Sequence, residues 1–403
     1  MNDLIINKAT EEFPTPFYLY EKECLINQAK KLKDSLFENA DICFSMKSNP
    51  LIGILKIFVD MGFGIEVASK GELVKALKSG CDASKIIFSG PGKERKEIDY
   101  AIENDIYCIN IENFTEIKII EESAATQNKN VNVGLRINPG VKSKGKISMS
   151  GNTQFGFEIN AIEKAITQIK ESEHLNLIGF QLYMGTQILD AEEIISNTEK
   201  IINLSLEISK QYGIELEYIN FGGGFGIPYF ANEHELDLNA LKDGLKNIYE
   251  KYPEIKNIKR IVFESGRFLM AESGVFVTKV LYKKQMGDSK YLICDGGSNY
   301  HASSAFLGRF VRNNFPMHTI SDFNEDEKVT VVGNLCTPTD VIGQNVTLKR
   351  AEEGDYVVIE KSGAYGLTYS PFGFLGHELP LEILFDNEYG YRVLKDKEGN
   401  ENF

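Results

Sequence analysis

The sequence lacks the features that mark membrane-spanning and secreted proteins. No stretch approaches the roughly 20 consecutive apolar residues that a membrane-spanning helix needs. The first residues, MNDLIINKATEEF, have neither the basic nor the apolar region of a secretory signal. The 6 cysteines are scattered singly and form no Cys-x-x-Cys pair, which argues against a disulfide framework and a cysteine zinc site. The sequence therefore predicts a reduced, cytoplasmic protein.

Clusters of positive charge and metal-binding motifs are also missing. The 44 Lys and Arg residues are outnumbered by 58 Asp and Glu residues, so the net charge is −14, and no basic stretch occurs. Nucleic-acid binding needs clustered Lys and Arg, so we expect no nucleic-acid partner. The 5 histidines show no His-Glu-x-x-His or His-x-His spacing. We therefore expect no metal, which disfavours a metal-dependent hydrolase.

What the sequence does contain is a regular alternation of two kinds of segment. Its length of 403 residues and 42% apolar content suit a globular protein of two domains. Short runs rich in β-branched and aromatic residues are each followed by a longer segment with helical periodicity. The expected strands are 41–47, 63–69, 86–90, 107–112, 131–139, 177–185, 216–224 and 260–266. This alternation predicts an α/β fold, a closed (β/α)8 barrel of the TIM type.

The pattern changes after about residue 268. Strand-like runs such as KYLICDGG, KVTVVGNL and GDYVVIEKSG follow one another closely, without long helical patterns between most of them. This indicates a C-terminal, mainly antiparallel β domain. The strand-like FYLY at 17–20 is a candidate to join it. We therefore predict a barrel over 30–268 and a β domain formed by 1–29 and 269–403.

Active sites of such barrels lie at the carboxyl ends of the strands, so polar residues there are the first candidates. Lys47 closes the first strand; it either forms a Schiff base with an aldehyde cofactor or extends to the rim. The run Gly222–Gly224 either approaches an anion closely or makes a tight turn. Glu264 and Arg267 form an ion pair or serve a heterocyclic N–H and a phosphate.

Weaker candidates lie elsewhere in the chain. Glu66 and Arg136 end two further strands. The turn-like stretches GNLCTPTD and GAYG hold Cys336 and Tyr365. A lone cysteine is more often a packing residue than a catalytic one. His301 is the one histidine that we single out.

Together these pieces form ten colinear motifs. They are FSMKSNP, EVASKGEL, LRINPG, TQFGF, GFQLYMGTQ, NFGGGFG, FESGRF, ICDGG, GNLCTPTD and GAYG. In this order they resemble the fold-type III pyridoxal 5'-phosphate (PLP) decarboxylases, the diaminopimelate and ornithine decarboxylase family with an alanine racemase-like architecture. SGPGK, TQFGF, CTPTD and GAYG are most similar to the specialised branch of siderophore and aminoglycoside side-chain biosynthesis. The resemblance implies a PLP-binding barrel and an amino-acid decarboxylase.

The resemblance also implies roles for individual residues. Lys47 would hold PLP covalently, and Glu264 would keep the pyridine nitrogen protonated, which favours decarboxylation over racemisation. Cys336 would return a proton to the substrate carbon from the second subunit, so a homodimer with shared active sites is implied. The remaining implied cofactor-binding residues are Glu66, Arg136, Tyr183, Thr186, Gly222, Gly223, Gly224, Gly266, Arg267 and Tyr365.

Two departures from the family concern the substrate. Tyr183 stands where the family often has a histidine stacked on the cofactor. Thr337 stands where members that take diamino acids have an acid for the distal ammonium, so we expect a distal carboxylate, amide or carrier-linked acyl group. Further candidates for substrate contact are Asp340, His301, Arg309 and Arg312.

Three alternatives remain open. The enzyme alternatives are a diaminopimelate-type decarboxylase of primary metabolism and an amino-acid racemase or epimerase on the same fold. The non-enzymatic alternative is a PLP-carrier protein built from a single barrel, which the residues after 268 and Cys336 disfavour.

Overall fold

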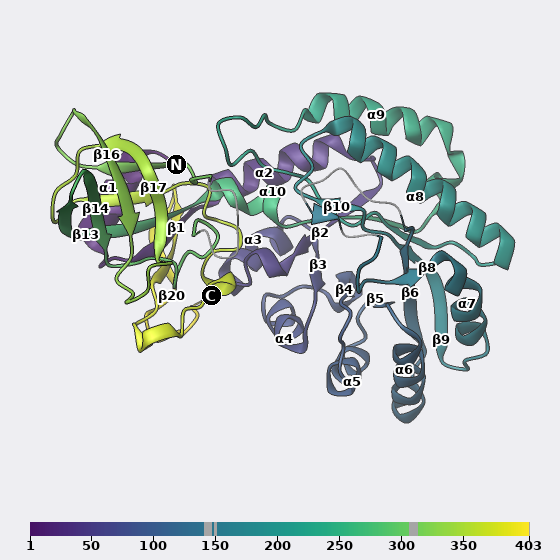
Figure 1. Ribbon diagram of the computed structural model, residues 1–403. Helices are drawn as coiled ribbons and strands as arrows, with labels where there is room; N and C mark the ends of the chain where they lie inside the picture. The colour runs from purple at the N-terminus through teal and green to yellow at the C-terminus, as the bar shows by residue number, and fades with distance from the viewer. Residues whose placement is uncertain (141–146, 149–150, 306–312, 403) are drawn as a thin grey trace.

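The protein is organised as a parallel barrel and a separate sheet domain, which lie at opposite ends of the molecule (Figure 1). The computed structural model describes residues 1–140, 147–148, 151–305 and 313–402. All site residues that the sequence suggests lie within these ranges except Arg309 and Arg312, which fall outside the described residues.

The barrel is closed by eight parallel strands, each forming hydrogen bonds with both of its neighbours. Around the barrel the strands follow the order β5-β4-β3-β2-β12-β11-β9-β6, and β6 pairs with β5. Their bounds are β2 Ala40–Ser45, β3 Gly64–Val67, β4 Ile86–Phe88, β5 Cys108–Ile111, β6 Val131–Asn138, β9 Leu175–Gln181, β11 Tyr218–Asn220 and β12 Arg260–Ser265. The predicted (β/α)8 barrel is confirmed.

Amphipathic helices cover the outside of the barrel. Several begin with a side-chain cap: Ser69 accepts a hydrogen bond from the backbone N–H of Glu72, and Asn113 from that of Glu116. The helices that follow successive strands are α3 Ile52–Asp60, α4 Lys70–Lys78, α5 Arg95–Glu103, α6 Phe114–Gln127, α7 Ile162–Lys170, α8 Ala191–Tyr212, α9 Leu238–Lys251 and the short α10 Arg267–Met270. None of the helices in the described ranges is long and apolar enough to cross a membrane.

The second part is a sheet whose main path runs β17-β16-β14-β13-β1-β19-β20, with β18 paired to β13 and β15 paired to β18. Most pairs are antiparallel, as predicted, although β1 pairs in parallel with β19 and β14 with β16. The bounds are β1 Phe17–Glu21, β13 Gly274–Met286, β14 Ser289–Cys294, β15 Met317–Ile320, β16 Asp326–Val332, β17 Val341–Lys349, β18 Tyr356–Ile359, β19 Leu381–Asp386 and β20 Gly390–Lys395.

The N-terminal segment contacts both parts of the molecule. Helix α1 (Asp3–Glu12) leads into β1, which contains the FYLY run and lies between β13 and β19. Helix α2 (Lys22–Ser35) then packs against α9 and α3 of the barrel and also contacts β19. The predicted domain boundary between residues 29 and 30 falls inside this helix. Because the helix contacts both parts of the molecule, the domain bounds stay a prediction.

Three short strands lie in the barrel loops. The short strands β7 (Ile147–Ser148) and β10 (Gly185–Thr186) pair with each other, and β8 (Phe157–Glu158) extends the sheet beside β6.

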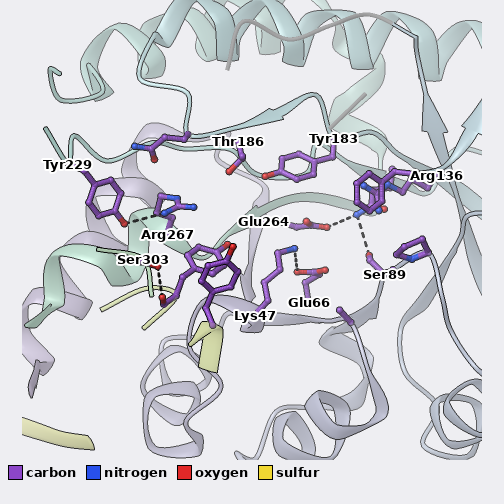
Figure 2. Close-up of a pocket in the computed structure, with 18 of the residues that line it drawn as sticks. Lys47, Glu66, Ser89, Arg136, Tyr183, Thr186, Tyr229, Glu264, Arg267 and Ser303 are labelled. Carbon is purple, nitrogen blue, oxygen red and sulfur yellow. Dashed lines mark hydrogen bonds and ion pairs between the residues drawn. The ribbon is translucent and has the colours of Figure 1, made fainter. Parts of the chain in front are cut away.

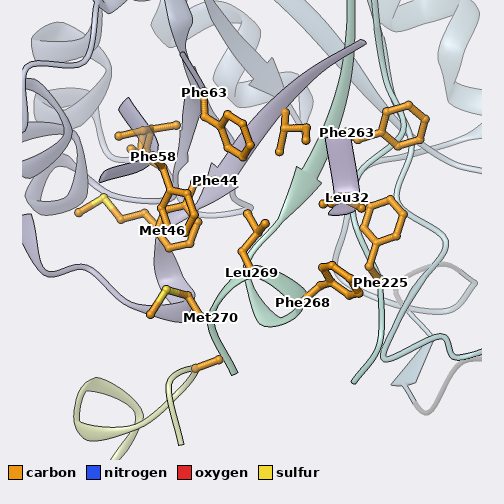
Figure 3. Close-up of a cluster of buried hydrophobic side chains, with 14 of the residues drawn as sticks. Leu32, Phe44, Met46, Phe58, Phe63, Phe225, Phe263, Phe268, Leu269 and Met270 are labelled. Carbon is orange, nitrogen blue, oxygen red and sulfur yellow. The ribbon is translucent and has the colours of Figure 1, made fainter. Parts of the chain in front are cut away.

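An aromatic cluster fixes the last barrel strand and the helix after it (Figure 3). Phe263 of β12 stacks on Phe221 with ring centroids 4.8 Å apart. Phe268, Leu269 and Met270 of α10 also bury their side chains, and all three are 5% exposed or less. Burying a side chain of this size stabilises the fold by about 1.5–3 kcal/mol. The end of β12 and the start of α10, which carry Glu264 and Arg267, are therefore supported by buried side chains.

Candidate active site

A cavity of about 460 Å³ opens at the carboxyl ends of the barrel strands. Residues that follow β2, β4, β6, β9 and β12 line it, together with Ser303 and Tyr365 from the β domain. Figure 2 shows the side chains of Lys47, Glu66, Glu264 and Arg267 pointing into the same space. Most of the lining surface is apolar, so the few charged groups stand out. A pocket of this kind is the usual place for a small-molecule site.

Lys47 lies in a turn of 3-10 helix directly after β2, with its amine open to the cavity. Its Nζ is 3.2 Å from Oε2 of Glu66, a buried residue of β3 (Figure 2). Burial acts to lower the pKa of Lys47, but the charges of Glu66 and Glu264 outweigh it and raise the pKa above the ordinary lysine value. The amine is thus held as a cation between two carboxylates.

Glu264 lies in β12 and is only 3% exposed. Its Oε1 accepts hydrogen bonds from the amides of Gln181 at 2.7 Å and Asn220 at 2.8 Å. Burial and the nearby charge of Glu66 raise the pKa of Glu264 to about 7, while Lys47 and the Asn220 amide act in the opposite direction. The amides hold one carboxylate oxygen and leave the other toward the cavity.

The three glycines after β11 form a cradle that no larger residue could form. A Cβ on Gly223 would lie 2.5 Å from the carbonyl oxygen of Glu264, and one on Gly224 would lie 2.3 Å from that of Gly185. Gly222 has a φ of +64°, and its Cβ would meet the Tyr183 ring at 2.7 Å. Gly223 and Gly224 border a small cavity that they share with Arg267, Thr186 and other residues.

Arg267 supplies the positive charge of this cradle. Its Nη1 donates a hydrogen bond to the Tyr229 hydroxyl at 3.3 Å, and its guanidinium lies 4.6 Å from the Tyr365 ring centroid. The Nε of Arg267 is buried and has no hydrogen-bond partner among the described residues, and the same holds for Oγ of Ser265. Buried donors are normally satisfied, so two orphaned groups beside a glycine cradle indicate a site for an anion.

Arg136, Tyr183 and Thr186 line the same cavity. Arg136 lies near the end of β6, forms a 2.8 Å ion pair with the buried Glu112, and stacks 4.6 Å from the Phe155 ring centroid. Tyr183 stands over Gly222 in the loop after β9. The barrel-borne candidates with side chains therefore come together around the larger cavity, which none of the four candidate glycines lines. Gly223, Gly224 and Gly266 border the small cavity, and Gly222 borders neither.

The candidates from the β domain lie differently. Cys336 is exposed and does not line the cavity in this chain. Thr337 is half-buried, with its hydroxyl 3.0 Å from that of Thr339. Asp340 is buried and accepts backbone N–H bonds from Ser298 at 2.6 Å and from Leu335 at 2.9 Å.

His301 is buried away from the cavity lining, against the Tyr18 and Phe276 rings. Burial lowers the pKa of His301 to about 3, so the imidazole is neutral.

Sequence reasoning did not single out the aromatic wall of the cavity or the amides beneath Glu264. The wall consists of Phe155, Tyr229, Phe230, Phe315 and Tyr369. Apart from the neighbours Tyr229 and Phe230, these residues come from separate loops, so no regular spacing in the sequence connects them. Gln181 and Asn220 did carry a signal, because each is a polar residue at the end of an otherwise apolar strand.

A family model described as the pyridoxal binding domain of pyridoxal-dependent decarboxylases matches residues 23–271, the segment that includes the whole barrel. The chain belongs to the pyridoxal-dependent decarboxylases. The predicted family, its PLP cofactor and the amino-acid decarboxylase activity are thereby confirmed.

Similar decarboxylases cover nearly the whole chain. The L-glutamyl-(BtrI acyl-carrier protein) decarboxylase of Niallia circulans is 39% identical over 97% of this chain and 93% of its own. The diaminopimelate decarboxylase of Haemophilus influenzae is 32% identical over the same shares. The solved diaminopimelate decarboxylase of Methanocaldococcus jannaschii has a TM-score of 0.88 at 28% identity, over 99% of this chain and 92% of that one. The first of these relatives agrees with the predicted specialised branch.

The residues present fit PLP. A phosphate matches the unpartnered Arg267 Nε and the glycine cradle, and the amine of Lys47 stands in the adjoining cavity for an aldehyde. The open oxygen of Glu264 suits a heterocyclic N–H. We infer that this decarboxylase holds its cofactor through these groups.

Proposed function

We propose that this decarboxylase removes the α-carboxylate of a glutamyl group whose distal carboxyl is joined to a carrier protein. The observation that carries the proposal is the charge of the cavity. Among the described lining residues the only carboxylates are Glu66 and Glu264. Glu66 is paired with Lys47, and Glu264 is held by two amides. No acid is left in this chain's cavity for a distal ammonium.

The chemistry of decarboxylation fixes how such a substrate is attached. The reaction needs a free α-amino group for the cofactor and a free α-carboxylate to leave as CO2. A glutamyl group can therefore be linked only through its distal carboxyl, which makes that end neutral. The aromatic wall of Phe155, Phe230 and Phe315 suits a neutral arm better than an ion.

Bound PLP supplies an electron sink for the pair of electrons that remains when the bond to the carboxylate breaks. In our proposal Lys47 binds the cofactor, and Arg267 with Gly222–Gly224 binds its phosphate. Glu264 holds a proton at the pyridine nitrogen, which favours decarboxylation over racemisation. Glu66 keeps the Lys47 amine oriented toward the cavity, as their 3.2 Å contact supports.

We further propose a homodimer in which Cys336 of one subunit serves the cavity of the other. The exposed Cys336 lies outside its own cavity, which supports this arrangement. A second support is the exposed apolar stretch beside the cavity, where Tyr369, Phe372, Phe374 and Leu375 are 43–67% exposed. All six cysteines are unpaired, which supports the expected cytoplasmic location.

A direct test compares substrates by CO2 release from the purified holoenzyme. We expect turnover of a glutamyl thioester of a phosphopantetheine arm, and at least about 100-fold lower kcat/KM for diaminopimelate, lysine and ornithine, since each would bury an unpaired ammonium. Efficient turnover of diaminopimelate would favour the alternative, which the second relative represents. Inversion in deuterated water without CO2 release would indicate a racemase.

A further inference from the structure

A closed ring of hydrogen bonds lies inside the barrel directly beneath Glu264. Its six members are buried to 3% exposure or less and come from five strands or their ends. Gln181 contacts Glu264 at 2.7 Å and Ser89 at 3.3 Å. Asn110 contacts Ser89 at 3.0 Å and Tyr218 at 3.4 Å. Asn220 closes the ring with contacts of 2.7 Å to Tyr218 and 2.8 Å to Glu264. Figure 2 shows the part of this ring that links Glu264 to Ser89.

The three amides in the ring use all of their hydrogens on three oxygens. Gln181 Nε2 donates to Glu264 and Ser89, and Asn220 Nδ2 donates to Glu264 and Tyr218. Asn110 Nδ2 donates to Ser89 and Tyr218. Each amide nitrogen has two hydrogens, so Oε1 of Glu264, Oγ of Ser89 and the Tyr218 hydroxyl oxygen each receive two donors.

This arrangement makes the two oxygens of Glu264 unequal. Oε1 already accepts two N–H groups, so a proton there would displace a donor. Oε2 has no protein partner among the described residues and is not among their buried unpartnered atoms, so it stays open to the cavity. Any proton that Glu264 shares with a group in the cavity is therefore directed to Oε2.

The ring is itself fixed from outside. The carbonyl oxygen of the Asn220 side chain accepts the backbone N–H of Gly222 at 2.8 Å, which ties the ring to the glycine cradle. A Cβ on Gly134 would lie 2.3 Å from Oδ1 of Asn110, so the neighbouring strand presses directly on this amide. The Asn110 and Asn220 amides therefore cannot turn without moving the barrel wall, whereas Oε1 of Gln181 is buried without a partner among the described residues.

We propose that Gln181 and Asn220 are positioning residues that keep Glu264 ionised and hold a shared proton on the pyridine nitrogen of the cofactor. This inference rests on the proposed pairing of Glu264 with that nitrogen. Burial alone favours a neutral Glu264, and a neutral Glu264 would leave the ring nitrogen unprotonated and the electron sink weaker. Two donors on one carboxylate oxygen oppose that effect of burial. Gln181 and Asn220 thus favour decarboxylation, because they help to keep the pyridine nitrogen protonated.

The test measures the nitrogen resonance of the holoenzyme loaded with PLP that is labelled with 15N in its ring. We expect a protonated ring nitrogen in the parent enzyme. The Gln181→Leu variant removes one donor to a charged group, which should change the ratio of ring-protonated to Glu264-protonated forms by about 10- to 100-fold and move the resonance toward neutral pyridine. Gln181→Glu, which puts a second carboxylate beside Oε1, should move it in the same direction.

The matched control is Gln28→Leu. Gln28 is a buried amide that donates to the Phe268 carbonyl and to Glu272, outside the cavity lining. This variant should keep the parent resonance, although it also loses buried hydrogen bonds. If Gln181→Leu cannot be purified with PLP bound, Gln181→Glu decides the question.

The possible failures are distinguishable. A neutral ring nitrogen in the parent enzyme would overturn the proposed pairing with Glu264. A protonated pyridine nitrogen in the parent enzyme, with unchanged resonances in the Gln181 variants, would overturn only the proposed role of the hydrogen-bond ring. A shift of equal size in Gln28→Leu would also overturn it, because the effect would then follow from lost stability.

Discussion

Replacing Arg267 by Met tests the anion cradle most directly. The buried Nε of Arg267 lacks a partner in the described structure, so a bound phosphate would gain a hydrogen bond from a charged donor that the protein does not otherwise use. Such bonds contribute about 1.5–3 kcal/mol. At 1.4 kcal/mol per factor of ten, we expect Arg267→Met to weaken PLP binding by about 10- to 100-fold.

The assay separates the phosphate from the rest of the cofactor. Apoenzyme is titrated with PLP and with pyridoxal, which has no phosphate, and binding is followed by the visible absorption of the Lys47 adduct. Arg267→Met should lose affinity for PLP and keep its affinity for pyridoxal. Equal loss for both ligands, or no loss for PLP, would refute the assignment of Arg267 to the phosphate.

A buried arginine at the other end of the barrel provides the control. Arg260 is 7% exposed and pairs with Asp41 at 3.0 Å. Arg260→Met should lower the free energy of unfolding without changing the preference for PLP over pyridoxal. For apo Arg267→Met we expect a change of no more than about 1 kcal/mol in that free energy, because relief of a buried charge offsets the lost contacts with Tyr229.

Three further predictions use the same structure. Gly223→Ala should lower the free energy of unfolding by about 1–3 kcal/mol in denaturant titrations, because its Cβ would clash with the Glu264 carbonyl; Gly71→Ala, whose Cβ would lie 3.7 Å from the Ser69 hydroxyl oxygen, should not. Burial raises the pKa of Glu264 from 4.5 to about 7 in the apoprotein, so the folded state binds the extra proton between these pH values and stability should fall as pH rises through that window. Glu264→Gln should flatten this part of the pH profile, and an unchanged slope would contradict the assignment. Lys47→Ala and Cys336→Ala subunits, each inactive alone, should regain about a quarter of parental activity when mixed and reassociated, since half of the dimers would have one intact site; no recovery despite exchange would contradict shared sites.

The barrel was predictable because its strands are buried on both faces. Such strands are near-continuous apolar runs, and each ends in polar residues that the fold has to gather at one rim. Lys47, Arg136 and Glu264 follow that rule, and the cavity brings them together as expected. The glycine run after β11 was recognisable for a different reason: three adjacent residues without side chains allow the backbone to approach an anion closely.

The amides of the hydrogen-bond ring were harder to predict. A polar residue inside an apolar strand is either an ordinary strand residue or a member of a buried hydrogen-bond network, and the sequence looks the same in both cases. Asn110 in β5 is flanked by apolar neighbours and read as an ordinary strand residue. Its side chain points inward, where it is completely buried and hydrogen-bonded. The sequence pattern does not give the height along the barrel axis at which a side chain lies, or the residues that face it across the axis. Both depend on the stagger of the closed sheet.

The GNLCTPTD motif shows why nearness in sequence does not give orientation. That Asp340 contacts the substrate stays a prediction; in this chain its carboxylate is buried and accepts the backbone N–H groups of Ser298 and Leu335. The glycines at 297 and 333 face each other across it, with Cα atoms so close that a Cβ on either would clash with the other. Cys336 lies on the exposed side of the same loop. Asp340 at the end of the motif therefore fixes the loop and Cys336 in its middle presents a thiol, and this division is what a cysteine needs if it is to reach into the cavity of a second subunit.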